Sequence, residues 1–193
     1  LGRMAQALVE PLLNSGSFSA DQVHAVVGSA ATAQRLAQGT FEAVSIHPSG
    51  CSEALQVWSA PVQLLAVKPQ QIDAIAAAAP DVDHHPLRGS VLAGVSLDRL
   101  QRLFPGHRVV RAVPNTPALV GEGLTALAWG EAISSEQRLK VRELFAGVSE
   151  VLELPEAKLD AFLALTSSGP AFVALMAEAC LLYTSPSPRD AQL

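Results

Sequence analysis

Four short stretches of this chain combine small residues, prolines and polar side chains in ways suited to binding a small molecule. The first is Gly-Arg-Met-Ala at residues 2–5, where an apolar helical pattern begins. Gly2 and Ala5 match the second and third small positions of G-x-G-x-x-[GA], a motif whose backbone N–H groups bind a pyrophosphate at a helix start. A plain helix start explains the same residues equally well.

The second stretch, Val-Val-Gly-Ser-Ala-Ala-Thr, follows a short β-branched run and contains no carboxylate. In dinucleotide-binding folds an acidic residue here selects NAD, so Ser29 and Thr32 lean toward the 2′-phosphate of NADP. A solvated turn accounts for them nearly as well.

Lys68 follows an apolar strand at the edge where open α/β sheets bind ligands, and Pro69 stiffens its loop. An ordinary surface lysine is the alternative.

The third stretch, Val-Pro-Asn-Thr-Pro, is followed by two glycines around a glutamate. Proline has no N–H for a sheet ladder and its ring fixes φ, so regular structure must stop at Pro114. The prolines leave Asn115 and Thr116 little conformational entropy to lose on binding. We expect a rigid wall of a ligand site here, with the glycines releasing the chain into its next strand.

The fourth stretch, Ser-Ser-Gly-Pro-Ala-Phe, leads into an apolar run with a single carboxylate, Glu178. Pro170 suits the first position of a helix, and the N–H groups of Ser168 and Gly169 then lack helical partners. Such a helix entrance suits a substrate carboxylate. An ordinary cap, with Glu178 facing water, is the alternative.

Neither a metal site nor a covalent nucleophile is predicted. His84 and His85 are adjacent and precede a proline, which is typical of a polar loop. Cys51 and Cys180 lack metal-ligand spacing, and two distant cysteines favour a reducing compartment over a disulfide framework.

The composition is that of one sizeable domain, or of one domain with a smaller second one. Of the 193 residues, 49% are hydrophobic and 16% are charged, which favours a buried core over disorder. The net charge of −5 offers no basic surface for nucleic acid. No apolar run approaches the roughly 20 residues that span a bilayer, so we expect no membrane partner. We expect a cytoplasmic location, with organelle targeting left open because no initiator Met is present.

Apolar runs alternate with helical patterns over the first part of the chain. The expected strands are residues 23–27, 41–46, 62–67, 90–95, 108–113, 123–129 and 150–154. Strands separated by helices of this length predict βαβ units and a mostly parallel sheet. The fold class is therefore α/β, with a Rossmann-type doubly wound sheet followed by the start of an all-helical dimerisation domain.

We place the domain boundary near residue 154. Residues 1–154 form the dinucleotide-binding domain, and residues 155–183 begin the helical dimerisation and substrate domain. Residues 184–193 have no periodicity and are expected to be disordered or foreign to the fold. An α/β domain of this kind opens with an apolar strand, whereas Leu1 already lies in the first loop, so we expect the first strand to be missing.

Six stretches in this order and spacing closely resemble pyrroline-5-carboxylate reductases: LGRMAQAL, AVKPQ, RAVPNTPALVGEGLTAL, LFAGVSEV, LDAFLAL and SSGPAF. The resemblance runs from residue 1 to about residue 182, and its most specific part is the Pro-Asn-Thr-Pro segment. It implies reduction of the cyclic imine 1-pyrroline-5-carboxylate to L-proline, the last step of proline biosynthesis, with hydride from NADPH or NADH. It also implies a helical domain that intertwines in a homodimer or larger homo-oligomer, with the active site near that interface.

The resemblance also implies site residues. The cofactor-binding residues are Gly2, Arg3, Met4, Ala5, Ser29, Ala66, Val67, Lys68, Pro69 and Asn115. The catalytic and substrate residues are Asn115, Thr116, Ser168 and Gly169, to which we add the helical Glu178. A protonated imine is already electrophilic, so hydride transfer requires orientation rather than a strong nucleophile.

The chain departs from the family pattern at several positions. The Arg usual after the second strand is absent, so the choice between NADH and NADPH stays open. Val113 stands where Met is common, and Thr-Ser-Ser-Gly-Pro-Ala-Phe replaces Ser-Gly-Ser-Gly-Pro-Ala-Tyr. The substrate-contacting Thr of a downstream helix has no counterpart. We therefore expect this 193-residue chain to bind cofactor weakly and to turn over slowly or not at all.

Two alternatives remain. A β-hydroxyacid dehydrogenase shares the fold plan and needs a catalytic lysine on a helix after the nucleotide domain. Only Lys140 and Lys158 are candidates, and neither lies in a matching motif. The other alternative is an inert nucleotide-binding fold without turnover.

Overall fold

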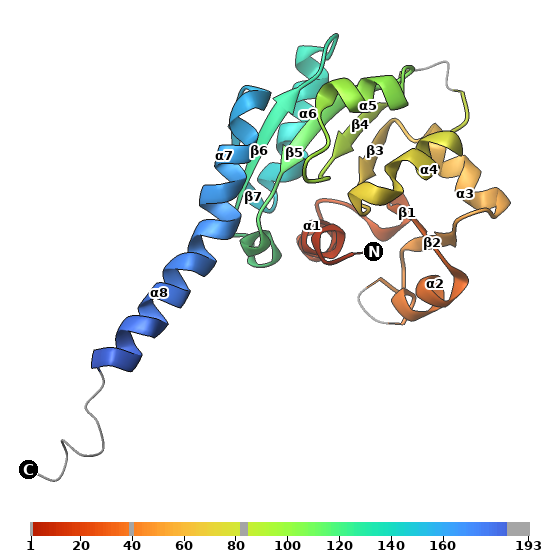
Figure 1. The fold of residues 1–193 in the computed structure, drawn as a ribbon. Helices are drawn as coiled ribbons and strands as arrows, with labels where there is room; N and C mark the ends of the chain where they lie inside the picture. Colours follow the sequence, from red (N-terminus) through yellow and green to blue (C-terminus); the bar gives the residue numbers. More distant parts are fainter. Residues whose placement is uncertain (1, 39–40, 82–84, 185–193) are drawn as a thin grey trace, which may run out of the picture.

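The computed structural model describes residues 2–38, 41–81 and 85–184 (Figure 1). Within this part of the chain, the strands form a two-stranded sheet, β1-β2, and a five-stranded sheet in the order β3-β4-β5-β6-β7. The strands are β1 (His24–Val27), β2 (Ser45–Pro48), β3 (Val62–Leu65), β4 (Leu87–Ser90), β5 (Arg108–Val113), β6 (Gly123–Trp129) and β7 (Ser149–Glu153).

Neighbouring strands are parallel except for β5 and β6. In that antiparallel pair, Val110 lies opposite Trp129 and Val113 lies opposite Ala126. A parallel pair needs a crossover rather than a tight turn, and helices alternate with strands along the chain accordingly. The predicted α/β class with a mostly parallel sheet is confirmed.

The α-helices are α1 (Arg3–Asn14), α2 (Ala30–Leu36), α3 (Ser52–Gln56), α4 (Ile72–Ala77), α5 (Leu97–Leu103), α6 (Ser135–Ala146), α7 (Leu159–Leu163) and α8 (Gly169–Thr184). Short 3₁₀ segments are η1 (Ala20–Gln22), η2 (Val57–Ser59), η3 (Pro69–Gln71), η4 (Thr116–Val120) and η5 (Glu156–Lys158), and η6 (Ala164–Ser168) is a π-helical turn. In the sequence, Ser96 before an apolar helical pattern predicts an N-cap, and Ser134 three residues before Gln137 predicts a capping box; both are confirmed. The Ser96 hydroxyl accepts the first-turn N–H of Arg99 in α5, and Ser134 and Gln137 form a capping box on α6.

Helices cover both faces of the five-stranded sheet, as β5 illustrates. Val110 packs with Leu8 of α1 and Phe145 of α6. The preceding residue, Val109, packs with Leu100 of α5 in a separate cluster. Alternate strand residues face opposite sides of a sheet, so β5 contributes side chains to the cores on both faces, as in a doubly wound arrangement.

The helical region follows β7 directly. It runs from η5 through α7 and the π turn into α8, which projects away from the sheets (Figure 1). Leu159 and Phe162 of α7 pack against Val113 and Ala126, which fastens the beginning of this region to β5 and β6. Thr184, predicted to open an irregular tail, is the last residue of α8; the rest of that tail lies outside the described residues.

Two predicted strands have different bounds in the structure. The strand expected at residues 41–46 is β2, and Phe41 and Val44 instead form a buried turn. The strand expected at residues 90–95 is β4, and Val95 is buried in the loop that follows. In both places apolar residues fill a core from a loop, which a strand pattern imitates.

The apolar run at residues 62–67 predicts a strand covered on both faces, and this prediction is wrong. Val62 and Leu64 are 43% and 36% exposed, whereas Leu65 is buried. β3 is an edge strand of its sheet, so its side chains have neighbouring strand residues on one side only.

Among the described residues, one helical run is long and apolar enough to cross a bilayer, Glu156–Tyr183. The sequence expectation of no such run is wrong in this sense. The polar residues of the π turn and Glu178 interrupt the apolar pattern but leave its mean high. Length and composition are weak evidence that a helix spans a membrane, because the core helices of soluble proteins can be as long and as apolar.

Candidate functional site

The first turn of α1 lies at the carboxyl end of β3. Gly2 is the N-cap, and a Cβ on it would stand 4.0 Å from the carbonyl oxygen of Ala66. The N–H groups that open a helix have no partners within it, and no acidic side chain occupies this turn. Ala5 is buried and Arg3 is exposed. The turn therefore offers unpaired N–H groups and a free guanidinium to an anion.

The loop after β3 lies next to this helix start. Ala66 and Val67 are half-buried, while the Lys68 side chain is exposed. The Lys68 N–H donates to Gln71 Oε1 at 3.2 Å, and Pro69 opens η3. The backbone of the loop is thus fixed, and its lysine is left to solvent or to a ligand.

The loop after β1 supplies hydroxyl groups. Ser29 is the N-cap of α2, and its Oγ accepts the Thr32 N–H at 3.3 Å and lies 3.0 Å from Thr32 Oγ1. Ser29 is exposed and Thr32 is half-buried, and residues 27–32 contain no carboxylate. This strand end can therefore meet a phosphate without charge repulsion.

The Pro-Asn-Thr-Pro segment closes β5 as predicted. Pro114 is buried, and the exposed Thr116 begins η4, which packs against α1 (Figure 1). Gly121 ends η4 with φ +77. A Cβ on Gly123 would lie 2.4 Å from Ser149 Oγ, so only glycine lets β6 start this close to β7.

Asn115 joins this segment to the helical region. Its Oδ1 accepts the Leu124 N–H at 2.8 Å, and its Nδ2 donates to the carbonyl oxygen of Thr166 at 3.3 Å. The side chain is 7% exposed. The stretches around Asn115 and Ser168 therefore lie together at the carboxyl end of β5.

Comparison with known proteins gives the same picture. A pyrroline-5-carboxylate reductase of Synechocystis sp. is 41% identical over 179 residues, which are 92% of this chain and 65% of the relative. One of Thermus thermophilus is 35% identical, covering 93% of this chain and 66% of the relative. The chain is similar to pyrroline-5-carboxylate reductases over nearly all of its length. It spans just under two thirds of the length of these relatives.

Two further comparisons agree with this family and its fold. Residues 1–94 match the family described as NADP oxidoreductase coenzyme F420-dependent. The solved pyrroline carboxylate reductase of Plasmodium falciparum, with NADP bound, superposes with a TM-score of 0.78 at 22% identity, covering 97% of this chain and 68% of that chain. The predicted Rossmann-type fold is confirmed.

The prediction that Ser168 and Gly169 offer unpaired N–H groups is wrong for Gly169. Gly169 is the first residue of α8, but the π turn runs directly into this helix, and the Gly169 N–H donates to the Ala164 carbonyl. A proline is tolerated at the first turn of a helix, and Pro170 made that interpretation natural. The helix instead widens before Pro170 and continues, so the Gly169 N–H is not free for a carboxylate, whereas the Ser168 side chain stays exposed.

Glu178 is not brought to this edge within one chain. It is exposed on α8, ten residues beyond Ser168, which is roughly 15 Å along a helix.

Two other contacts were missed by the sequence analysis. Thr166 supplies the carbonyl that Asn115 binds, and its signal was Pro170, four residues later.

Arg111 is the second missed residue. It is 5% exposed, with Nη1 3.1 Å from Glu156 Oε1 and Nη2 3.2 Å from Asp160 Oδ1. Glu156 Oε1 also accepts the Leu97 N–H at 2.7 Å, at the start of α5. An arginine inside an apolar strand, with acidic residues four apart on a later helix, was the available signal. These ion pairs tie the helical region to the sheet beside the site.

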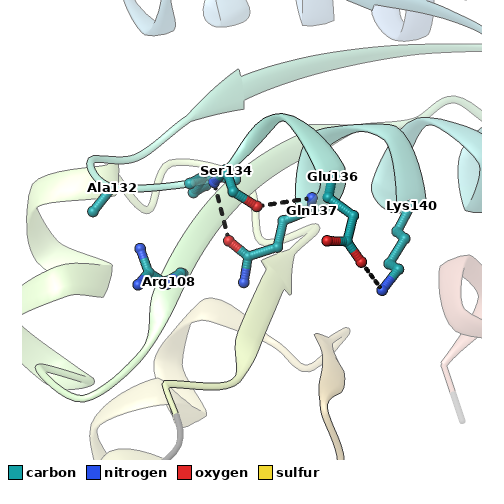
Figure 2. Close-up of a pocket in the computed structure, with 7 residues that line it drawn as sticks. Arg108, Ala132, Ser134, Glu136, Gln137 and Lys140 are labelled. Carbon is teal, nitrogen blue, oxygen red and sulfur yellow. Dashed lines mark hydrogen bonds and ion pairs between the residues drawn. The ribbon is translucent and has the colours of Figure 1, made fainter.

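A hollow of about 610 Å³ opens at the other end of β5 (Figure 2). Its polar groups bind one another. Lys140 Nζ lies 2.7 Å from Glu136 Oε1, and Ser134 and Gln137 cap α6 reciprocally. Arg108, in its wall, is the first residue of β5, and Val113 is the last, roughly 17 Å away. No predicted site residue lines this hollow, and Lys140, a candidate for a dehydrogenase, lies here rather than at the site.

Within the described part of the chain, no group of three or more His, Cys, Asp or Glu could hold a metal ion. His84 lies outside it, and His85 Nδ1 is 3.0 Å from the Gly106 carbonyl oxygen.

Proposed function

We propose that the whole protein reduces 1-pyrroline-5-carboxylate to L-proline with hydride from NADPH or NADH, the last step of proline biosynthesis. The observation that carries the proposal is the 41% identity to a reductase of that name over 92% of this chain. The start of α1, the loop after β3 and the Asn115–Thr166 contact supply a cofactor side and a substrate side to such a site.

The cofactor fits the first turn of α1. Gly2 and Ala5 leave room beside the backbone, and the N–H groups of residues 3–5 together with the Arg3 guanidinium suit a pyrophosphate. Residues 66–69 border the same helix start and face the ribose next to the nicotinamide. When bound, the reduced nicotinamide supplies the hydride.

A preference for NADPH over NADH is part of the proposal. Ser29 is exposed, Thr32 is half-buried beside it, and no carboxylate lies among residues 27–32 to repel a 2′-phosphate or to bind a free ribose hydroxyl. The Plasmodium falciparum relative was solved with NADP bound.

The substrate side consists of hydroxyl groups. Ser168 and Thr116 are exposed near the contact between Asn115 and the helical region, and they can donate to the substrate carboxylate. The imine needs no nucleophile because it is electrophilic once protonated. The chain's contribution is to hold the imine carbon against the hydride donor and to exclude water.

We further propose that α8 is covered by a second copy of this chain. Phe172, Val173, Leu175, Met176 and Leu182 are 62% to 77% exposed along it. A helix that is apolar all round belongs in a protein interior, and an exposed apolar surface of this length marks an interface. The helix points away from its own sheets, so a neighbouring protomer can pack along it (Figure 1).

Analytical ultracentrifugation tests the dimer. The wild-type chain is expected to sediment as a dimer and Met176→Glu as a monomer, while Glu136→Gln on α6 leaves the dimer intact. A wild-type chain that stays monomeric, or that co-sediments with lipid vesicles instead of self-associating, overturns this part.

A cytoplasmic location completes the proposal. Cys51 forms no disulfide within the described part of the chain, which fits a reducing compartment, and cell fractionation checks the location.

The activity is tested by following NADPH oxidation by the full-length protein over a range of 1-pyrroline-5-carboxylate concentrations. We expect imine-dependent oxidation, lower with NADH, and a raised KM for the imine in Ser168→Ala. Ser17→Ala, which removes a hydroxyl near the end of α1, is the matched control. Oxidation of 2-hydroxy or 3-hydroxy acids with NADP⁺, together with no turnover of the imine, contradicts the proposal and favours the dehydrogenase class.

A further inference from the structure

Pro170 leaves one carbonyl of the helical region without its usual partner. In an α-helix the carbonyl of a residue accepts the N–H four residues later, and for Thr166 that residue is Pro170, which has no N–H. The proline ring also crowds this carbonyl. The π turn Ala164–Ser168 widens the helix at this point. The Thr166 carbonyl therefore lacks its α-helical donor and can accept a hydrogen bond from outside its own helix.

Asn115 supplies that donor from the end of β5. Its Nδ2 lies 3.3 Å from the Thr166 carbonyl oxygen, while its Oδ1 is occupied by the Leu124 N–H at 2.8 Å. If the Asn115 amide were flipped, its Oδ1 would face the Thr166 carbonyl oxygen and its Nδ2 would face the Leu124 N–H. Only a side chain with one acceptor and one donor in this geometry satisfies both groups, and glutamine is one methylene too long.

This contact fixes the part of the helical region that packing does not hold. Phe162 is packed against the sheet, but in the next turn Leu165 is 76% exposed and Ser168 is also exposed. Among the described residues, the hydrogen bond from Asn115 to Thr166 connects this turn to the end of β5. Ser168 follows Thr166 by two residues, so the position of its hydroxyl depends on that hydrogen bond.

We propose that Asn115 is a positioning residue. By holding the carbonyl that Pro170 leaves unpaired, it fixes Ser168 over the carboxyl end of β5 and so sets the affinity for the substrate carboxylate. The inference deepens the proposed imine reduction and rests on it. It also changes the predicted role of Asn115, which acts on the helical region and not directly on the cofactor.

Asn115→Asp tests the contact, because it keeps an acceptor for Leu124 and places a carboxylate oxygen against the Thr166 carbonyl. We expect amide hydrogen exchange in residues 163–169 to accelerate about tenfold, as for a lost buried hydrogen bond. KM for the imine rises by about the same factor, while the Kd of NADPH stays within about twofold. Asn14→Asp, the same change at the exposed end of α1, alters none of these.

Pro170→Ala distinguishes positioning from general stability. It restores the missing N–H, so the helix can satisfy Thr166 by itself. In this background Asn115→Asp is expected to accelerate exchange by less than about threefold, because the two changes act on one carbonyl.

Equal effects of Asn115→Asp in both backgrounds overturn the inference, as does a parallel rise of KM and of the NADPH Kd. Unchanged exchange at residues 163–169 also overturns it. Hydrogen exchange and NADPH binding need no turnover. A wild-type protein without imine reduction therefore refutes the proposed function, while the exchange data still decide the contact.

Discussion

Two buried arginines in neighbouring strands are held in opposite ways. Arg88 of β4 has no carboxylate partner among the described residues; its guanidinium carbon lies 3.9 Å from the Phe104 ring centre and 4.8 Å from that of Trp58. It also hydrogen-bonds Gln63 and His107. Arg111 of β5 instead binds two carboxylates of the helical region.

Arg88 therefore contributes to packing inside the sheet domain, whereas Arg111 attaches the helical region to it. The ring contacts of Arg88 hold elements of the sheet and of α5 together, and a cation over aromatic rings gains from desolvation. The carboxylate partners of Arg111 are accessible to solvent, because the Glu156 side chain is 31% exposed and that of Asp160 is 83% exposed. Beside the apolar packing of Leu159 and Phe162, the helical region is therefore attached by weaker, water-accessible ion pairs, which lie next to the proposed substrate side of the site.

The largest expected effect is that of Arg88→Ala. It removes a fully buried side chain and leaves a cavity between Trp58 and Phe104, so we expect a loss of about 3–4 kcal/mol in the free energy of unfolding. Urea denaturation measures it. A loss below about 1 kcal/mol would show that the cation–π arrangement contributes little.

Arg111→Met has a smaller and more local effect. We expect a loss of about 2 kcal/mol, because the released carboxylates can regain water. Hydrogen exchange should accelerate at residues 156–163 but not in β3 or β4. Arg142→Met removes an exposed pair with Glu153 and should cost about 0.5 kcal/mol or less. Uniform acceleration across the sheet contradicts the distinction between the two arginines.

Arg88 also predicts a pH dependence. Burial lowers the pKa of its guanidinium to about 9 from an ordinary value of 12.5. Above pH 9 the folded chain has lost this proton and the unfolded chain retains it, so unfolding takes up a proton and stability rises with pH.

The matched variant isolates this contribution. The free energy of unfolding of the wild type minus that of Arg88→Met should be flat below about pH 8 and should rise toward about pH 10. A difference that stays flat over the whole range, or that falls, contradicts the assignment.

Local patterns in the sequence predicted much of this fold. The capping residues Ser96 and Ser134 and the strand ending at Val113 were correct because their signals act within a few residues. Apolar loops such as that of Val95 were mistaken for strands, since burial there comes from packing against α4 and α5 and not from strand pairing. The family resemblance and its site stretches were identified from motif order.

The site contacts were harder to predict because they are made at long range. Asn115 and Thr166 are 51 residues apart, and no local pattern pairs them. The path of the chain at Ser168 was wrong because a proline is compatible both with a helix start and with a widened turn inside a helix. Arg111 looked like a polar interruption of a strand until its partners on the helical region were known.

The most direct measurement of the central claim is hydrogen exchange with and without NADPH. The account predicts slowed exchange at residues 2–6, 28–32 and 65–69, the segments that border the proposed cofactor site, with no change at residues 132–140. Slowed exchange at residues 132–140, around the hollow at the other end of β5, with no change at residues 2–6, would contradict it.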